Sequence, residues 1–246
     1  MQHDDGQIGR VLTRREAVAL IGASGFAIFT GSVPATRGGR TSGSGSVPGC
    51  VVRPAQTEGP YFVDERLNRS DIRSDPASGV IKPGTPLDLA IEVSRVEKGD
   101  CLPVPGAQVD IWHCDALGVY SDVNDPGFST VGQKFLRGYQ VTDAAGVARF
   151  RTIYPGWYEG RTVHIHFKIR TQPRAARGRE FTSQVYFDDA LSDAVYAKAP
   201  YAAKGRRTAR NGDDGIFRSG GSQLLLAPKA SGDGYTARFG VALELT

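Results

Sequence analysis

The 246-residue sequence is poor in several features, and each scarcity narrows what the chain can be. It has only four histidines, so a metal site built on imidazole has few positions to use. The formal net charge of +4 is too small to indicate a nucleic-acid partner, and the basic residues lack interleaved aromatic side chains. The uncharged run at residues 17–30 is too short and too weakly apolar to span a bilayer comfortably. We therefore expect no nucleic acid partner and no stable membrane insertion.

Residues 1–35 are expected to be an export signal. Arg14 and Arg15 precede the uncharged residues 17–30, and residues 33–35 (VPA) form a small-residue cleavage pattern. Paired arginines before such a weak apolar run are typical of the twin-arginine route, which carries folded proteins. The alternative is an amphipathic or disordered N-terminal tail.

A Gly/Ser-rich linker is expected at residues 36–49, followed by a folded domain at residues 50–246. The three cysteines suit an oxidising compartment, with one disulfide and one leftover thiol. Cys101 and Cys114 would lie at opposite ends of an extended segment, too far apart to be bridged. Cys50 is therefore the expected common partner, and its pairing with Cys101 or with Cys114 stays open.

The 31 glycines and 14 prolines favour turns over long helices. Only residues 189–198 have a convincing helical pattern, which Pro200 ends. Residues 50–75 are expected to be an irregular lead-in that wraps the domain, and residues 205–221 a loop. Short alternating strands separated by turns predict an all-β fold, a β-sandwich. The expected strands cover residues 87–94, 108–113, 136–141, 147–153, 161–169, 182–187 and 235–245.

The central pattern lies at residues 161–169, where apolar residues alternate with His164, His166 and Lys168. A period of two is typical of a half-buried strand, so both histidines point to the same face. They would lie about 6.5–7 Å apart along the strand, at about 3.3 Å per residue, and can bind one metal ion. The alternative is a strand whose polar face carries two histidines and no metal.

Further candidate side chains follow neighbouring strands. Tyr120 and Tyr158 each follow a strand on a turn marked by glycine, where functional side chains are often displayed. Asp115, Asp122 and Glu159 are the nearby carboxylates. A zinc hydrolase built on the histidine pair would need a third histidine or one of these carboxylates, and it would have no need of paired tyrosines.

Four motifs in order resemble those of the intradiol ring-cleavage dioxygenases, the family of the protocatechuate and catechol dioxygenases. They lie at residues 57–61 (TEGPY), 109–121 (VDIWHCDALGVYS), 152–161 (TIYPGWYEGR) and 164–166 (HIH). The resemblance implies an enzyme that uses O2 to cleave a catechol ring between its two hydroxyl-bearing carbons, giving a cis,cis-muconic acid. The alternatives are the zinc hydrolase and a non-catalytic β-sandwich that binds polyphenol or carbohydrate.

The resemblance also implies a ligand set. Tyr120, Tyr158, His164 and His166 would bind one ferric ion through two tyrosinates and two imidazoles. A trivalent cation favours the phenolate over the phenol. Two phenolates and one hydroxide balance Fe(III), and anionic oxygen ligands hold the iron in the ferric state. Tyr158 would be the ligand that dissociates and takes a proton when catechol binds.

Three further roles follow from the resemblance. Arg161 would stabilise negative charge on the substrate ring, Gln184 would lie near the iron-bound oxygens, and Tyr61 would line the substrate pocket. The alternatives are a surface charge for Arg161, an ordinary strand residue for Gln184 and aromatic packing for Tyr61. His113 shares a strand face with apolar residues, so we expect a core histidine rather than a fifth ligand.

The preferred catechol and the oligomeric state stay open. Only five residues connect Tyr158 to His164, fewer than in the corresponding loop of protocatechuate dioxygenases. We therefore expect a more open pocket with fewer contacts to a ring substituent. The family is compatible with a homo-oligomer.

Overall fold

A computed structural model describes residues 51–172 and 178–244 of the chain. The expected signal at residues 1–35, the linker at residues 36–49 and Cys50 lie outside these residues. Of the two described cysteines, Cys114 is buried and free, whereas Cys101 is disulfide-bonded.

One sheet is organised around its longest strand, β1 (Pro86–Glu97). On one side β11 (Gly234–Leu243) runs parallel to β1, and β10 (Lys229–Ser231) pairs with the outer edge of β11. On the other side β7 (Val147–Ile153) and β2 (Asp100–Pro103) pair antiparallel with the first and second parts of β1. The alternation of apolar residues along β1, β7 and β11 correctly predicts these three strands.

Strand β2 was not among the expected strands. Lys98 and Gly99 both have positive φ, 52° and 90°, so a two-residue turn sends the chain back along β1. Two positive φ values in succession are typical of a tight hairpin turn that matches the twist of paired strands. The short strand was missed because the prolines nearby favoured a turn at residues 102–106.

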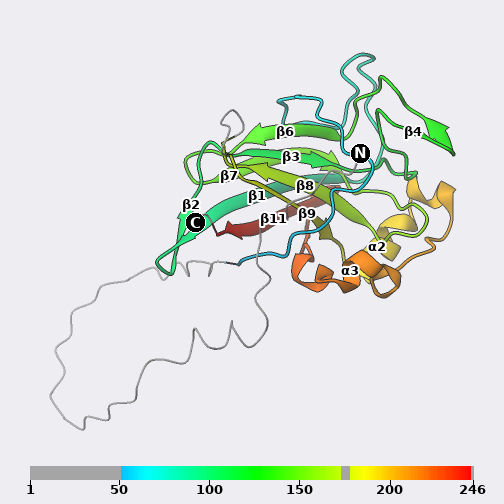
Figure 1. Ribbon diagram of the computed structural model, residues 1–246. Helices are drawn as coiled ribbons and strands as arrows, with labels where there is room; N and C mark the ends of the chain where they lie inside the picture. The colour runs from blue at the N-terminus through cyan, green and yellow to red at the C-terminus, as the bar shows by residue number, and fades with distance from the viewer. Residues whose placement is uncertain (1–50, 173–177, 245–246) are drawn as a thin grey trace, which may run out of the picture. The chain divides into compact units, whose positions relative to one another are not determined.

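The second sheet contains four antiparallel strands in the order β6 (Arg137–Val141), β3 (Gln108–Trp112), β8 (His164–Arg170) and β9 (Glu180–Tyr186). In Figure 1, β6 and β3 of this sheet lie above β1 and β11. All four strands lie where the sequence predicts them. The histidine-bearing strand β8 is a central strand of its sheet, so it is held by hydrogen bonds on both sides.

The core lies between the two sheets. Ile165 and Phe167 of β8 are fully buried, and the ring centroid of Phe167 lies 5.9 Å from that of Phe239 in β11. Each such buried side chain contributes about 1.5–3 kcal/mol of transfer free energy. The prediction of an all-β sandwich is confirmed.

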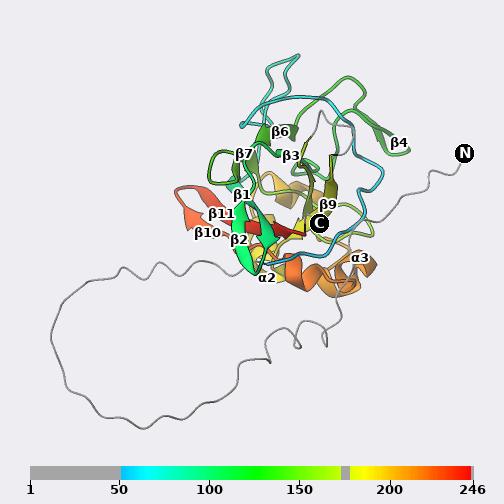
Figure 2. The same ribbon diagram turned by 60° about the vertical axis from the view of Figure 1, so that its left-hand side comes forward.

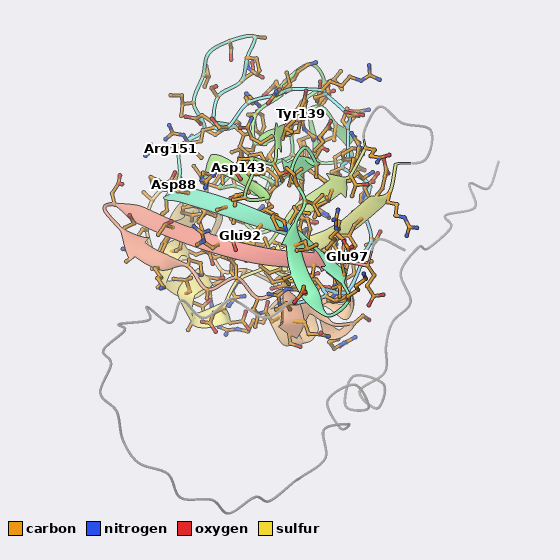
Figure 3. All side chains as sticks on the ribbon, turned by 90° about the vertical axis from the view of Figure 1, so that its left-hand side faces the viewer. Asp88, Glu92, Glu97, Tyr139, Asp143 and Arg151 are labelled. Carbon is orange, nitrogen blue, oxygen red and sulfur yellow. The ribbon has the colours of Figure 1, made fainter. Side chains whose placement is uncertain are left out.

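The opposite face of the β1 sheet is charged. Figure 3 shows Asp88 and Glu92 pointing outward from β1, with Arg151 beside Asp88. An Arg151 nitrogen lies 3.8 Å from an Asp88 oxygen, and both side chains are more than half exposed. This strand therefore has one buried and one solvated face, as its sequence predicts.

Strand β8 differs, because His164, His166 and Lys168 are buried as well as the apolar residues. The expectation of a half-buried strand is wrong here. The lead-in at residues 51–75 covers the polar face, and in Figure 2 it runs outside β9 and over the top beside β6. The backbone amide of Gln56 donates to Thr182 at 3.0 Å, and isolated bridges continue the contact along the lead-in.

Helix α2 (Asp189–Tyr196) forms where the helical pattern predicts it, and the Asp188 side chain caps it by accepting from two backbone amides. Residues 205–221, expected to be a loop, contain short helical turns instead. Polar caps such as Asp214 begin these turns without any apolar periodicity. The remaining helical turns and the small hairpin are η1 (Tyr201–Lys204), η2 (Asn211–Asp213), α3 (Gly215–Arg218), η3 (Gly221–Leu224), β4 (Asn124–Asp125) and β5 (Phe128–Ser129).

In the part of the chain that the structure describes, no helix is long and apolar enough to cross a membrane.

Candidate metal centre

Four side chains meet over the polar face of β8: Tyr120, Tyr158, His164 and His166. The Nε2 atom of His164 lies 3.0 Å from Nε2 of His166 and 3.2 Å from the hydroxyl of Tyr158. The ring of Tyr120 stands edge-on to Tyr158, with centroids 5.7 Å apart, and lies 6.5 Å from the ring of His166. The structure thus gathers at one place the four residues that the resemblance implies as ligands.

The donor atoms of this cluster suit a metal ion. Two nitrogens that bind one ion at about 2.1 Å and at a right angle lie about 3.0 Å apart, which is the spacing of the two Nε2 atoms. Within the described residues the hydroxyl of Tyr120 is buried and has no hydrogen-bond partner. A buried unpaired hydroxyl costs about 1–3 kcal/mol, and coordination to a cation would remove that cost.

A backbone carbonyl fixes the tautomer of one imidazole. Nδ1 of His164 lies 2.6 Å from the carbonyl oxygen of Thr162, which can only accept, so Nδ1 carries the proton. Nε2 of His164 therefore presents its lone pair to the cluster. This arrangement, with the second ring nitrogen held by a carbonyl, is common among histidines that bind metals.

Burial keeps all four side chains uncharged in the absence of a cation. It lowers the pKa of His164 to about 3, helped by the nearby charge of Arg161, and it lowers the pKa of His166 well below its ordinary value. Burial likewise raises the pKa of Tyr120 and of Tyr158. A cation placed among these atoms would lower the pKa of both tyrosines, because it stabilises the phenolate directly.

Two glycines allow the tyrosine-bearing turns to approach each other. A Cβ atom on Gly156 would lie 2.3 Å from the carbonyl oxygen of Asp115, and one on Gly118 would lie 2.2 Å from that of Trp157. The amide of Gly156 donates to Asp115 at 3.1 Å. The glycines of the two tyrosine motifs are therefore explained by close packing of the two turns.

His166 is enclosed by the lead-in and by the neighbouring strand. Trp112 lies opposite His166 in the sheet, and its ring stacks on the imidazole with centroids 5.0 Å apart and an interplanar angle of 8°. Gly59 has a φ of +72°, and a Cβ atom there would lie 3.3 Å from Cε1 of His166. The lead-in motif at residues 57–61 therefore forms part of the site.

Arg161 and Gln184 lie together beside the histidines. An Arg161 Nη atom donates to Oε1 of Gln184 at 2.6 Å, and Nε donates to Oδ2 of Asp214 at 2.9 Å. The amide of Thr162 donates to the same Asp214 oxygen at 3.0 Å. Burial alone lowers the pKa of Arg161, but Tyr158 and Asp214 more than reverse this, so the guanidinium stays charged.

Sequence reasoning missed Asp214. It is 1% exposed and accepts hydrogen bonds both from Arg161 and from the amide of Thr162, the residue whose carbonyl holds the His164 ring. The only local signal is an aspartate before a glycine, which is typical of a helix cap, and Asp214 does accept from the amides of Ile216 and Phe217. Nothing in that signal indicates a contact with a residue 53 positions earlier.

Tyr61 stacks on Tyr120, with ring centroids 4.4 Å apart, and stands edge-on to Tyr158 at 6.1 Å. Its hydroxyl donates to Oδ2 of Asp125 at 2.7 Å. Tyr61 is half-buried, so it packs against a donor residue and also borders the solvent side of the cluster. Asp125, in the small β4–β5 hairpin, was not among the candidate residues.

His113 is the core histidine that the sequence predicts. It is 1% exposed, and its ring nitrogens pair with the carbonyl of Cys114 at 2.8 Å and the hydroxyl of Thr152 at 2.7 Å. Burial lowers its pKa to about 4. Its two polar atoms are satisfied without a metal.

The three carboxylates considered earlier have other environments. Asp115 forms an ion pair with Lys82 at 3.0 Å, Asp122 accepts from the amide of Gly132 at 2.7 Å, and Glu159 is exposed. Among the described residues no group of three or more His, Cys, Asp or Glu side chains gathers around a metal position. The third ligand that a zinc hydrolase needs is not supplied by these residues.

Comparisons with known proteins give one family throughout. A family model described as "Dioxygenase" (Dioxygenase_C) matches residues 57–211. The chain is 32% identical over 163 residues to the protocatechuate 3,4-dioxygenase beta chain of Burkholderia cepacia, covering 61% of this chain and 67% of the relative. It is 31% identical over 113 residues to a chlorocatechol 1,2-dioxygenase of Pseudomonas putida, covering 38% of this chain and 39% of the relative.

Solved structures agree. An intradiol ring-cleavage dioxygenase from Tetranychus urticae matches with a TM-score of 0.68 and 30% identity, covering 79% of this chain and 95% of that one. The dioxygenase domain of a dioxygenase carbohydrate-binding protein fusion from Streptomyces sp. SirexAA-E matches with a TM-score of 0.56 and 30% identity, covering 80% and 100%.

Proposed function

This chain belongs to the intradiol ring-cleavage dioxygenases, and we propose that it cleaves a catechol between its two hydroxyl-bearing carbons with O2, giving a cis,cis-muconic acid. Both oxygen atoms enter the product, so the reaction needs no further reductant. The observation that carries the proposal is the meeting of two phenol oxygens and two imidazole nitrogens over β8. The relatives are named for protocatechuate and chlorocatechol, which share two adjacent ring hydroxyls and differ in their substituents.

The donor set suits Fe(III), which Tyr120, Tyr158, His164 and His166 would hold. Buried phenols lose their protons only where a strong positive charge compensates, and paired anionic oxygens favour the ferric over the ferrous ion. Bound there, a ferric ion would bind both oxygens of a catechol and draw electron density from the ring, which opens a ring carbon to attack by O2.

The protein's own residues supply proton transfer and charge. Tyr158 is the only half-buried member of the four, so its hydroxyl oxygen is the ligand atom best placed to take a proton from an entering catechol. Arg161 holds a positive charge beside the site, oriented by Asp214 and Gln184, where it stabilises negative charge on the substrate ring. Trp112 covers one face of His166 and excludes water from it.

The cellular setting is also part of the proposal. We propose that residues 1–35 direct export by the twin-arginine route, since a folded protein can then carry its metal across the membrane. The substrate would accordingly be a catechol met outside the cytoplasm. Assembly as a homo-oligomer stays a prediction.

The test is oxygen uptake by the Fe(III)-loaded full chain with 4-methylcatechol under ¹⁸O2. We expect one O2 consumed for each ring-opened product, and two labelled oxygens in that product. Tyr158→Phe is expected to abolish turnover, whereas Tyr139→Phe, a matched change on a residue labelled in Figure 3, is expected to keep it. Binding of the catechol without oxygen uptake would contradict the proposal and favour a non-catalytic sandwich.

A further inference from the structure

Most of the donor cluster is buried. Tyr120, His164 and His166 are at most 2% exposed, and Trp112 is buried behind them. Tyr158 is half-buried, and so are Tyr61 and Phe62, which pack against Trp112 and Tyr120. Tyr61 contacts the rings of both Tyr120 and Tyr158, so a substrate bound at these two tyrosines would lie close to Tyr61.

A carboxylate is held beside Tyr61. The Tyr61 hydroxyl donates to Oδ2 of Asp125 at 2.7 Å, and the amide of Gly127 donates to Oδ1 at 3.1 Å. The small hairpin of β4 and β5 thus fixes the carboxylate in place. Figure 1 shows β4 at the edge of the domain. The hydrogen bond from Tyr61 lowers the pKa of Asp125, so the side chain is ionised at neutral pH.

The positive charges near the site are already engaged. Asp214 pairs with Arg161 at 2.9 Å. Arg137 is 2% exposed and directs its nitrogens to Ser121 and to the backbone carbonyl of Tyr61. Over the ranges 51–172 and 178–244, no lysine or arginine forms an ion pair with Asp125. Asp125 is therefore an uncompensated negative charge beside Tyr61.

We propose that the carboxylate of Asp125 sets substrate preference, so that the site takes neutral catechols and rejects catechols that carry a carboxylate. This inference rests on the proposed ring-cleaving function. A carboxylate substituent on the ring would meet the like charge of Asp125. Two unit charges about 6 Å apart at an effective dielectric constant of about 40 change affinity about tenfold. A methyl or hydroxyl substituent carries no such penalty, and a hydroxyl can donate to the carboxylate.

The test is substrate binding without O2 to the Fe(III)-loaded full chain, comparing 4-methylcatechol with 3,4-dihydroxybenzoate. We expect the neutral ligand to bind about tenfold more tightly, and the preference to shrink with added salt, because a half-exposed charge is screened. Asp125→Asn is expected to bring the two dissociation constants within about twofold. Tyr61→Phe keeps the carboxylate and is expected to keep the preference.

The matched control is Asp88→Asn, which removes the same charge from the outer face of β1, labelled in Figure 3. It is expected to leave the preference unchanged. An equal preference for the two ligands in the unmodified chain, or a preference that Asp125→Asn leaves intact, would overturn the inference while ring cleavage still occurs. A chain that binds and cleaves neither ligand would overturn the proposed function and this inference together.

Discussion

Replacing Asp214 by alanine is expected to destabilise the protein strongly, because this carboxylate joins the site to a separate part of the chain. It is buried and accepts from the side chain of Arg161 at 2.9 Å and the amide of Thr162 at 3.0 Å. Its second oxygen accepts from the amides of Ile216 at 2.7 Å and Phe217 at 3.3 Å. The substitution leaves a largely buried guanidinium unpaired and removes a helix cap.

The magnitude follows from those contacts. Removing one partner of a buried ion pair costs about 3–5 kcal/mol. The side chain of Arg161 is 16% exposed and keeps its bond to Gln184, which favours the lower end of that range. Loss of a cap adds about 1 kcal/mol. We expect the free energy of unfolding to fall by about 4 kcal/mol.

The measurement is urea unfolding of the metal-free full chain at pH 7. Asp213→Ala is the matched control, since the neighbouring aspartate is exposed and accepts, among the described residues, only from the amide of Arg210 at 2.9 Å. We expect that change to cost about 1 kcal/mol. Losses that agree within about 1 kcal/mol for the two variants would refute the reasoning from buried charge.

Two further predictions concern a glycine and a histidine. Gly59→Ala and Gly79→Ala both place alanine at a φ of +72°, which is expected to lower the free energy of unfolding by about 1–2 kcal/mol in each case. The two positions differ in their surroundings, because a Cβ atom at residue 59 would contact His166 and one at residue 79 would have no neighbour within 4 Å. We therefore expect the two variants to have similar urea midpoints, and only Gly59→Ala to lose iron faster to a chelator. Equal retention of iron in the two variants would contradict a role for this close approach. Burial lowers the pKa of His113 to about 4, so only the unfolded chain takes up a proton between pH 6.5 and 4. The stability contributed by neutral His113 is complete above pH 6.5, and about 3 kcal/mol of it is lost as the pH falls toward 4. A His113→Gln variant whose stability falls just as steeply over that range would contradict this prediction.

Local patterns in the sequence are enough to predict most strands and the pairing of the two histidines. A period of two places His164 and His166 on one face wherever the strand lies, because alternate side chains of any strand share a face. The same pattern predicts that this face is exposed to solvent, whereas the structure shows it buried. The lead-in has no regular secondary structure of its own and covers this face, where Glu58 pairs with Lys168 and Gly59 lies close to His166.

The remaining ligands and their supports depend on contacts between distant segments. Tyr120 and Tyr158 were identified by resemblance and by their glycine-marked turns, and close packing of those turns now explains the glycines. Asp214 and Asp125 act through hydrogen bonds to residues 53 and 64 positions away. Such bonds leave no periodic trace in the sequence, so these two residues could be found only in the folded chain.

The most direct test of the central claim is the visible absorption spectrum of the full chain loaded with Fe(III), measured together with its iron content. Two tyrosinates and two histidines on one ferric ion predict one iron per chain and a burgundy colour, from charge transfer between phenolate and iron. Tyr120→Phe is expected to lose most of this absorption, and Tyr139→Phe to keep it. One tightly bound iron without visible absorption, or a spectrum unchanged in both Tyr120→Phe and Tyr158→Phe, would contradict the account.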